Sequence, residues 1–68
     1  MTISKNIRKY RKCKGITQKE LAKRSGYSVS YIKRLESSIK TNISIETLFR
    51  LSKALNVDIR YLLYKKHI

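Results

Sequence analysis

The chain has 68 residues, of which 17 are lysine or arginine and only 4 are aspartate or glutamate, so its formal net charge is +13 at pH 7. A chain of this length has room for one small core, and its 41% of hydrophobic residues is too high for a basic disordered tail. We therefore expect one folded domain over residues 1–68 whose partner is a polyanion, either nucleic acid or an anionic membrane.

The residue inventory argues against an enzyme, a metal protein and a membrane-spanning protein. Cys13 and His67 are the only cysteine and histidine, so neither a disulfide nor a zinc site is expected. The four carboxylates show no paired arrangement for catalysis, and no apolar run approaches the roughly 20 residues of a membrane span. Residues 1–10 lack the apolar stretch of a signal peptide. We expect a cytoplasmic protein with no catalytic residue, no metal, no cofactor and no small-molecule ligand.

Hydrophobic spacing predicts a first helix at about residues 4–14, with Ile3, Ile7 and Tyr10 on its inward face. Gly15 is expected to end this helix in the left-handed conformation. The next segment, Thr17–Glu20, has the pattern of a capping box, in which the threonine hydroxyl and the glutamate carboxylate each accept a hydrogen bond from the other residue's amide. A second helix is therefore expected at about residues 17–25.

A tight turn is predicted between this second helix and a third at about residues 28–37. Gly26 can adopt the positive φ that such a turn requires, and Ser28 is the candidate N-cap of the third helix. The inward faces of the two helices are predicted to carry Leu21, Ala22, Ile32 and Leu35.

Two further helices are predicted after a linker at about residues 40–43. Ser44 can cap the fourth helix, Glu46 is favourably placed in its first turn, and Asn56 can end it. Asp58 can cap the fifth helix, which carries Ile59, Leu62 and Leu63. The fourth helix is expected to bury one apolar stripe, made of Ile45, Leu48, Leu51 and Leu55. The fold class predicted is all-α, a compact bundle of five helices.

One set of spacings points to a helix-turn-helix. Counted from Gln18 as the first position, Ala22 is fifth, Gly26 ninth, Ile32 fifteenth and Leu35 eighteenth. A small residue where two helices cross lets the backbones approach, glycine permits the turn, and the two later apolar residues anchor the second helix of the pair.

The chain resembles the Cro and phage-repressor type (XRE-like) helix-turn-helix family from about Ile7 to Leu63. The stretches that carry the resemblance are Ile16–Ala22, Ser30–Glu36 and Ala54–Val57. The resemblance implies a lambda-repressor-like DNA-binding domain from a bacterium, plasmid or phage that places its third helix in the major groove of double-stranded DNA. It also implies a transcriptional regulator, by default a repressor that acts as a homodimer on a palindromic operator.

The resemblance and the helical spacing together assign DNA contacts. Ser30, Lys33, Arg34 and Ser37 recur at i, i+3, i+4 and i+7, on the face opposite the predicted buried pair of the third helix. Base readout is expected from Val29, Ser30, Lys33 and Arg34. Phosphate contacts are expected from Thr17, Gln18, Lys19, Ser28, Ser38 and Lys40.

The resemblance further implies an ion pair between Arg11 and Glu36, which would hold the first helix to the end of the third. Several apolar groups near the C-terminus exceed what a small core absorbs, and we expect them to form a homodimer interface: Phe49, Ile59, Tyr61, Leu63 and Tyr64. Ser37–Ile39 replaces the Asn-Gly turn common in the family, so the path of the loop after the third helix stays open.

Alternative functions also stay open. An antitoxin, an activator or a restriction-modification controller would share this architecture. A cationic membrane-surface protein would need one broad amphipathic helix, whereas this pattern gives several short capped helices. An RNA-binding protein for single strands would need aromatic platforms that the pattern lacks.

Overall fold

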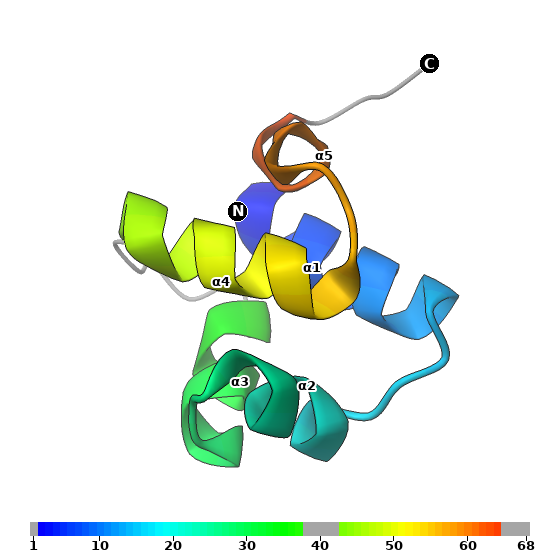
Figure 1. The fold of residues 1–68 in the computed structure, drawn as a ribbon, viewed down its shortest axis with the longest axis vertical. Coiled ribbons are helices and arrows are strands. Elements are labelled where there is room, and N and C mark those ends of the chain that lie inside the picture. Colours follow the sequence, from blue (N-terminus) through cyan, green and yellow to red (C-terminus); the bar gives the residue numbers. More distant parts are fainter. Residues whose placement is uncertain (1, 38–42, 65–68) are drawn as a thin grey trace.

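The computed structural model describes residues 2–37 and 43–64 of the chain. All the elements in this part are helices: α1 (Thr2–Cys13), α2 (Gln18–Ser25), α3 (Val29–Glu36), α4 (Ile45–Leu55) and α5 (Ile59–Leu63) (Figure 1). The all-α prediction and the order of the five helices are confirmed. The first helix begins two residues earlier than its predicted start at Ser4.

The five helices surround one apolar core. Helices α2 and α3 cross at one end of the molecule, α4 lies between this pair and α5, and α1 runs behind α4 (Figure 1). Each of the five helices contributes to the buried set: Ile7, Leu21, Ala22, Ile32, Leu35, Leu48, Leu51, Leu55 and Leu62. Burying one apolar face of each short helix supplies the stability that such helices lack alone.

Local sequence signals set most of the helix ends. The N-cap side chains of α2 to α5 accept hydrogen bonds from backbone amides of the first turn, and they belong to Thr17, Ser28, Ser44 and Asp58. Three residues that follow helices have positive φ, namely Gly15 at 70°, Gly26 at 80° and Asn56 at 57°. These caps and turns confirm the predicted boundaries, because each satisfies amide or carbonyl groups that a helix end leaves unpaired.

Only half of the predicted capping box forms. The Thr17 Oγ1 accepts from the Glu20 amide at 3.0 Å, but the Glu20 carboxylate accepts from Arg24 Nε at 2.8 Å rather than reaching back to the Thr17 amide. The arginine lies four residues further along the same helix, which is a favourable spacing for an ion pair. The glutamate therefore pairs along α2 instead of closing the cap.

The predicted apolar stripe of α4 is wrong at its first member. Leu48, Leu51 and Leu55 are buried, whereas Ile45 is 60% exposed. At 100° per residue, Ile45 lies roughly a quarter turn and Phe49 roughly a third of a turn from the centre of the buried face. The remaining width of that face is filled by the small polar residues Thr47 and Ser52. Ile45 and Phe49 therefore project from the molecule side by side on α4.

Helix α5 is held at both ends. Asn6 of α1 is buried, and its Nδ2 donates to the carbonyl oxygens of Leu62 at 3.0 Å and Tyr64 at 2.7 Å. At the other end, the side-chain hydrogen bond from Arg60 lowers the pKa of the capping Asp58 below its ordinary value. The Asp58 carboxylate is therefore ionised and caps α5 at any pH above its ordinary pKa. The stabilising cap is lost only as the pH falls through the lowered pKa of the folded chain.

The hydroxyl of Ser4 is an exception to good polar pairing in the core. Ser4 is fully buried in α1, and its Oγ has no hydrogen-bond partner among the described residues. We expect Ser4→Ala to raise the free energy of unfolding by about 1 kcal/mol, because an unpaired buried polar group is removed and alanine favours helix. Thermal unfolding should show a melting temperature higher by several degrees.

The control for this prediction is Ser25→Ala. The Ser25 side chain is also buried in a helix, but its Oγ donates to the Leu21 carbonyl at 2.7 Å. This variant should gain less stability than Ser4→Ala. An equal gain in both variants would mean that the Ser4 hydroxyl carries no penalty of its own.

Candidate nucleic-acid interface

The turn between α2 and α3 fixes which face of α3 points outward. Gly26 bends the chain, Ala22 is 3% exposed at the crossing of the two helices, and Ile32 and Leu35 are fully buried. Because the buried pair occupies one side of α3, the polar side of the helix faces solvent. Four residues at helical spacing are exposed there: Ser30, Lys33, Arg34 and Ser37.

Val29 differs from the other predicted base-reading residues. It is half-buried and packs partly against the core, since it lies at the first residue of α3 beside the turn. Only part of its side chain is available to a ligand. Ser30, Lys33 and Arg34 form the exposed polar face of α3, and we call these three residues with Ser37 the α3 face.

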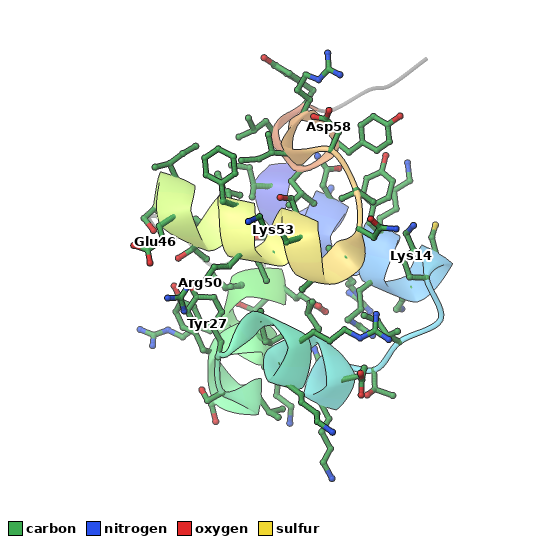
Figure 2. The ribbon with its side chains drawn as sticks, viewed as in Figure 1. Lys14, Tyr27, Glu46, Arg50, Lys53 and Asp58 are labelled. Carbon is green, nitrogen blue, oxygen red and sulfur yellow. The ribbon has the colours of Figure 1, made fainter. Side chains whose placement is uncertain are left out.

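The helix-turn-helix is fastened to α4 by a group that the sequence analysis did not identify. Tyr27, in the turn, donates its hydroxyl to Thr47 Oγ1 at 3.1 Å. The Arg50 guanidinium lies 5.3 Å from the centre of the Tyr27 ring and 3.3 Å from the Glu46 carboxylate, and Figure 2 shows these three side chains gathered beside the turn. Cation–π and hydrogen-bond contacts of this kind orient the turn against α4. The spacing of Glu46 and Arg50 at i, i+4 was the available signal.

Arg11 and Glu36 form a buried ion pair beneath the α3 face. Arg11 Nε and Nη2 lie 2.7 and 3.0 Å from the two Glu36 carboxylate oxygens, and Arg11 Nη1 donates to the Ile16 carbonyl at 2.9 Å. The two side chains are 11% and 3% exposed. A two-pronged arginine–carboxylate contact fixes both distance and orientation, so the start of α2 and the end of α3 are held to α1.

Gln18 belongs to the same network. Its Nε2 donates to Glu36 Oε1 at 3.1 Å, so its side-chain amide is turned toward the ion pair and not fully outward as expected. The backbone amides of Gln18 and Lys19, in the first turn of α2, have no partner within the helix. These amides are donors for an anion at this helix end, and the hydrogen bond to Glu36 leaves the second proton of Gln18 Nε2 for the same use.

The structure places the other predicted phosphate-contacting residues as follows. Lys19 is exposed on α2. Thr17 and Ser28 are exposed, and their hydroxyl oxygens accept from the amides of Glu20 and Tyr31. A hydroxyl that accepts such a bond keeps its own proton for donation to a ligand. Ser38 and Lys40 lie outside the described residues.

Known proteins share the sequence pattern of this chain. A family model described as helix-turn-helix matches residues 7–62. The chain belongs to the helix-turn-helix family. It is 40% identical over 65 residues to the HTH-type transcriptional regulator SinR of Bacillus subtilis, covering 96% of this chain. The chain spans only 59% of the length of that relative. The match and the fold confirm the family resemblance seen in the sequence.

Two solved structures support the same assignment. The crystal structure of SinR in complex with DNA superposes with a TM-score of 0.84 at 39% identity, covering 91% of this chain and 98% of that one. The restriction-modification controller protein C.AhdI from Aeromonas hydrophila gives a TM-score of 0.83 at 31% identity, covering 90% and 91%. These relatives are named as regulators and controllers, not as enzymes.

The charges of this helix-turn-helix chain are divided unevenly along its helices. Each of the four carboxylate side chains pairs with an arginine, in the pairs Arg11–Glu36, Arg24–Glu20, Arg50–Glu46 and Arg60–Asp58. The other 13 lysines and arginines therefore have no aspartate or glutamate that is not already paired with an arginine. Among the described residues, Lys53 is the only one of these cations beyond α3. In the part of the chain that the structure describes, the unpaired positive charge is therefore concentrated between the start of α1 and the end of α3.

The opposite half of the helix-turn-helix chain exposes apolar side chains. Ile45, Phe49, Tyr61 and Tyr64 are 60%, 51%, 42% and 56% exposed, whereas the predicted interface residues Ile59 and Leu63 are half-buried. Tyr61 stacks on Tyr10 of α1, with ring centres 5.6 Å apart. Two residues along a helix turn by about 200°, so Tyr61 lies on a different side of α5 from Ile59 and Leu63. The three predicted interface residues of α5 therefore do not share one face of that helix.

Proposed function

We propose that the chain is the sequence-specific, double-stranded-DNA-binding part of a transcriptional regulator and that α3 enters the major groove. The α3 face carries the proposal, because Ser30, Lys33 and Arg34 are exposed on a helix whose other side is fixed in the core. The concentration of unpaired cations on α1 to α3 supports it, since a duplex presents two rows of phosphates beside any helix in its groove. The complex of SinR with DNA supports it further.

Within this proposal Arg34 reads sequence. Its side chain is exposed and has no carboxylate partner among the described residues, so its forked guanidinium is available to O6 and N7 of guanine. Ser30, one turn earlier, reaches the neighbouring base edge, and the exposed part of Val29 contacts a thymine methyl group. The backbone amides at the start of α2, with Thr17, Lys19 and Ser28, hold the flanking phosphates and set the register of α3.

The regulatory role proposed is repression by a homodimer. One short helix covers too little of the groove for tight specific binding, so two copies would read half-sites about 34 Å apart on a palindromic operator and block a promoter. Control of a restriction-modification system is the second candidate, supported by the likeness to C.AhdI. Both roles use the same DNA-binding surface.

Selection of bound duplexes from a random pool tests the proposed function. We expect enrichment of a palindrome whose half-sites are one helical turn apart and an affinity that falls steeply with salt, at a log–log slope of about 0.9 for each neutralised phosphate. Anionic vesicles and single-stranded RNA serve as competitors. Failure to enrich any duplex, or displacement of the duplex by either competitor at equal phosphate concentration, would contradict the proposal.

The second copy is proposed to cover the α4 surface at Ile45 and Phe49. Both side chains are more than half exposed and adjacent on the helix, and no unpaired carboxylate borders them. We expect Phe49→Asp to convert the dimer to a monomer in sedimentation and to lower operator affinity by at least tenfold, because a charge would have to be buried at the contact.

Tyr61→Asp is the matched comparison for this prediction, since Tyr61 is exposed to a similar degree but leans on Tyr10. This variant should stay dimeric. A dimer that survives Phe49→Asp and dissociates with Tyr61→Asp would move the interface to the α1–α5 side.

A further inference from the structure

A hollow lies beside the α3 face, between α1, the start of α2 and the end of α3. Its volume is about 380 Å³, and it is lined by Arg8, Arg11, Gln18, Lys33, Glu36 and Ser37. These residues come from three helices and from the residue that ends α3, so the hollow exists only in the folded chain. The hollow therefore lies next to the base-reading residues of the α3 face, on the side toward α1.

The charges in the hollow are not balanced. Glu36 is neutralised by Arg11, whose three guanidinium nitrogens are all engaged, two by Glu36 and one by the Ile16 carbonyl. Arg8 and Lys33 are exposed, and neither has a carboxylate partner among the described residues. The lining thus has three cations and one carboxylate, which leaves two positive charges that the protein does not pair.

The buried ion pair also aligns these two cations. Arg8 lies three residues before Arg11 on α1, and Lys33 lies three residues before Glu36 on α3, so each unpaired cation stands one helical turn from a member of the pair. The contact between Arg11 and Glu36 fixes α1 against α3 at this point. Arg8 and Lys33 therefore line the same hollow from two different helices, α1 and α3.

We infer that this hollow binds one backbone phosphate of the DNA duplex, with Arg8 and Lys33 as its two cationic contacts. The inference rests on the proposed function, because a helix in the major groove has a sugar–phosphate strand on each side. It adds α1 to the DNA-binding surface through Arg8. It also assigns Lys33 of the α3 face to a phosphate contact and not to base readout.

Salt dependence of binding to the selected duplex tests the inference. Counterion release counts the phosphates neutralised, so Arg8→Gln combined with Lys33→Gln should lower the log–log slope by about 0.9, the value for one phosphate. Between 50 and 200 mM salt, the affinity of this double variant should then fall about threefold less than that of the wild-type chain. Its ranking of duplex sequences should stay unchanged, because phosphate contacts carry no base information.

Lys53→Gln is the matched control, since Lys53 is exposed and unpaired but lies on α4 (Figure 2). It is not among the residues that line the hollow. This variant should leave the slope unchanged. A slope loss of about 1.8 in the double variant would mean that Arg8 and Lys33 contact separate phosphates, and would overturn the shared site. A double variant with the wild-type slope would overturn it as well.

A duplex with one neutral methylphosphonate locates the phosphate. Moved along each strand of the half-site, the neutral linkage should weaken the wild-type chain at one position and have a smaller effect there on Arg8→Gln and on Lys33→Gln. Different positions for the two variants would contradict the inference. Failure of the wild-type chain to bind any duplex would instead refute the proposed function, so the two failures are distinguishable.

Discussion

Replacing Glu36 with alanine is expected to lower the free energy of unfolding by about 3 to 5 kcal/mol. The substitution leaves the Arg11 guanidinium nearly buried without its counter-ion, and an unpaired buried charge costs far more than an ion pair contributes. It also removes the acceptor of the Gln18 side chain. For a chain of this size, 1 kcal/mol corresponds to about 4 to 8 °C, so the melting temperature should fall by more than about 10 °C.

The comparison variant is Glu46→Ala, which breaks the ion pair between Glu46 and Arg50. The side chains of this pair are far more exposed than those of Arg11 and Glu36. We expect this change to cost no more than about 1 kcal/mol. Operator affinity of Glu36→Ala, measured at a temperature where the variant is folded, should also fall, since α3 is no longer tied to α1. An unchanged melting temperature of Glu36→Ala would mean that the Arg11–Glu36 ion pair does not position α3.

Arg34→Ala is expected to lower operator affinity by about 1 to 3 kcal/mol, which is roughly 5- to 150-fold. The reason is the loss of two hydrogen bonds to one guanine. Titration against duplexes that differ at single base pairs should show that discrimination is lost at one position of the half-site and kept elsewhere. Arg34→Lys should retain the charge but not the discrimination, because an ammonium group lacks the fork of a guanidinium.

Lys19→Gln is the comparison for Arg34→Ala, because Lys19 is exposed on α2 and is assigned to phosphate. It should weaken all duplexes by a similar factor and lower the salt slope. If Arg34→Ala behaved in the same way, with uniform weakening and no lost position, Arg34 would be a phosphate contact and the base-reading role would be wrong.

The features of the fold that sequence predicts well are the local ones. Helix caps and positive φ values depend on the residue itself and its near neighbours, so they can be predicted from the sequence. Examples are the caps Ser28, Ser44 and Asp58 and the positive φ of Gly26 and Asn56. The burial of Ile32 and Leu35 follows from helical period and motif spacing. These elements are enough to orient the α3 face.

The features that sequence misses depend on competition between partners. The Glu20 carboxylate had two possible partners within one helical turn, the Thr17 amide and the Arg24 side chain. It accepts a hydrogen bond from Arg24 instead of completing the capping box. Ile45 fits an apolar stripe by its spacing, but it lies at the edge of the face that Leu48, Leu51 and Leu55 bury, and it stays exposed. Which partner wins is decided by the packing of α4 and by side-chain geometry, and neither is encoded in a periodic pattern.

The candidate site was predictable in outline and not in detail. Exposure of Ser30, Lys33 and Arg34 follows from the pattern, yet the hollow beside them depends on how α1 meets α3, 25 residues apart at the Arg11–Glu36 contact. For the same reason the hydrogen bond from the Gln18 side chain to Glu36 was not predicted. The resemblance implied the Arg11–Glu36 pair, but the contact of that pair with Gln18 and the hollow beside it need the folded chain.

Chemical-shift mapping of the ¹⁵N-labelled chain with the selected duplex would show whether α3 enters the groove. We expect the largest amide shifts along the exposed side of α3, further shifts at the start of α2 and at Arg8, and small shifts on α4 near Lys53. Shifts concentrated on α4 and α5, with the amides of Ser30 and Arg34 unmoved, would contradict this placement of α3.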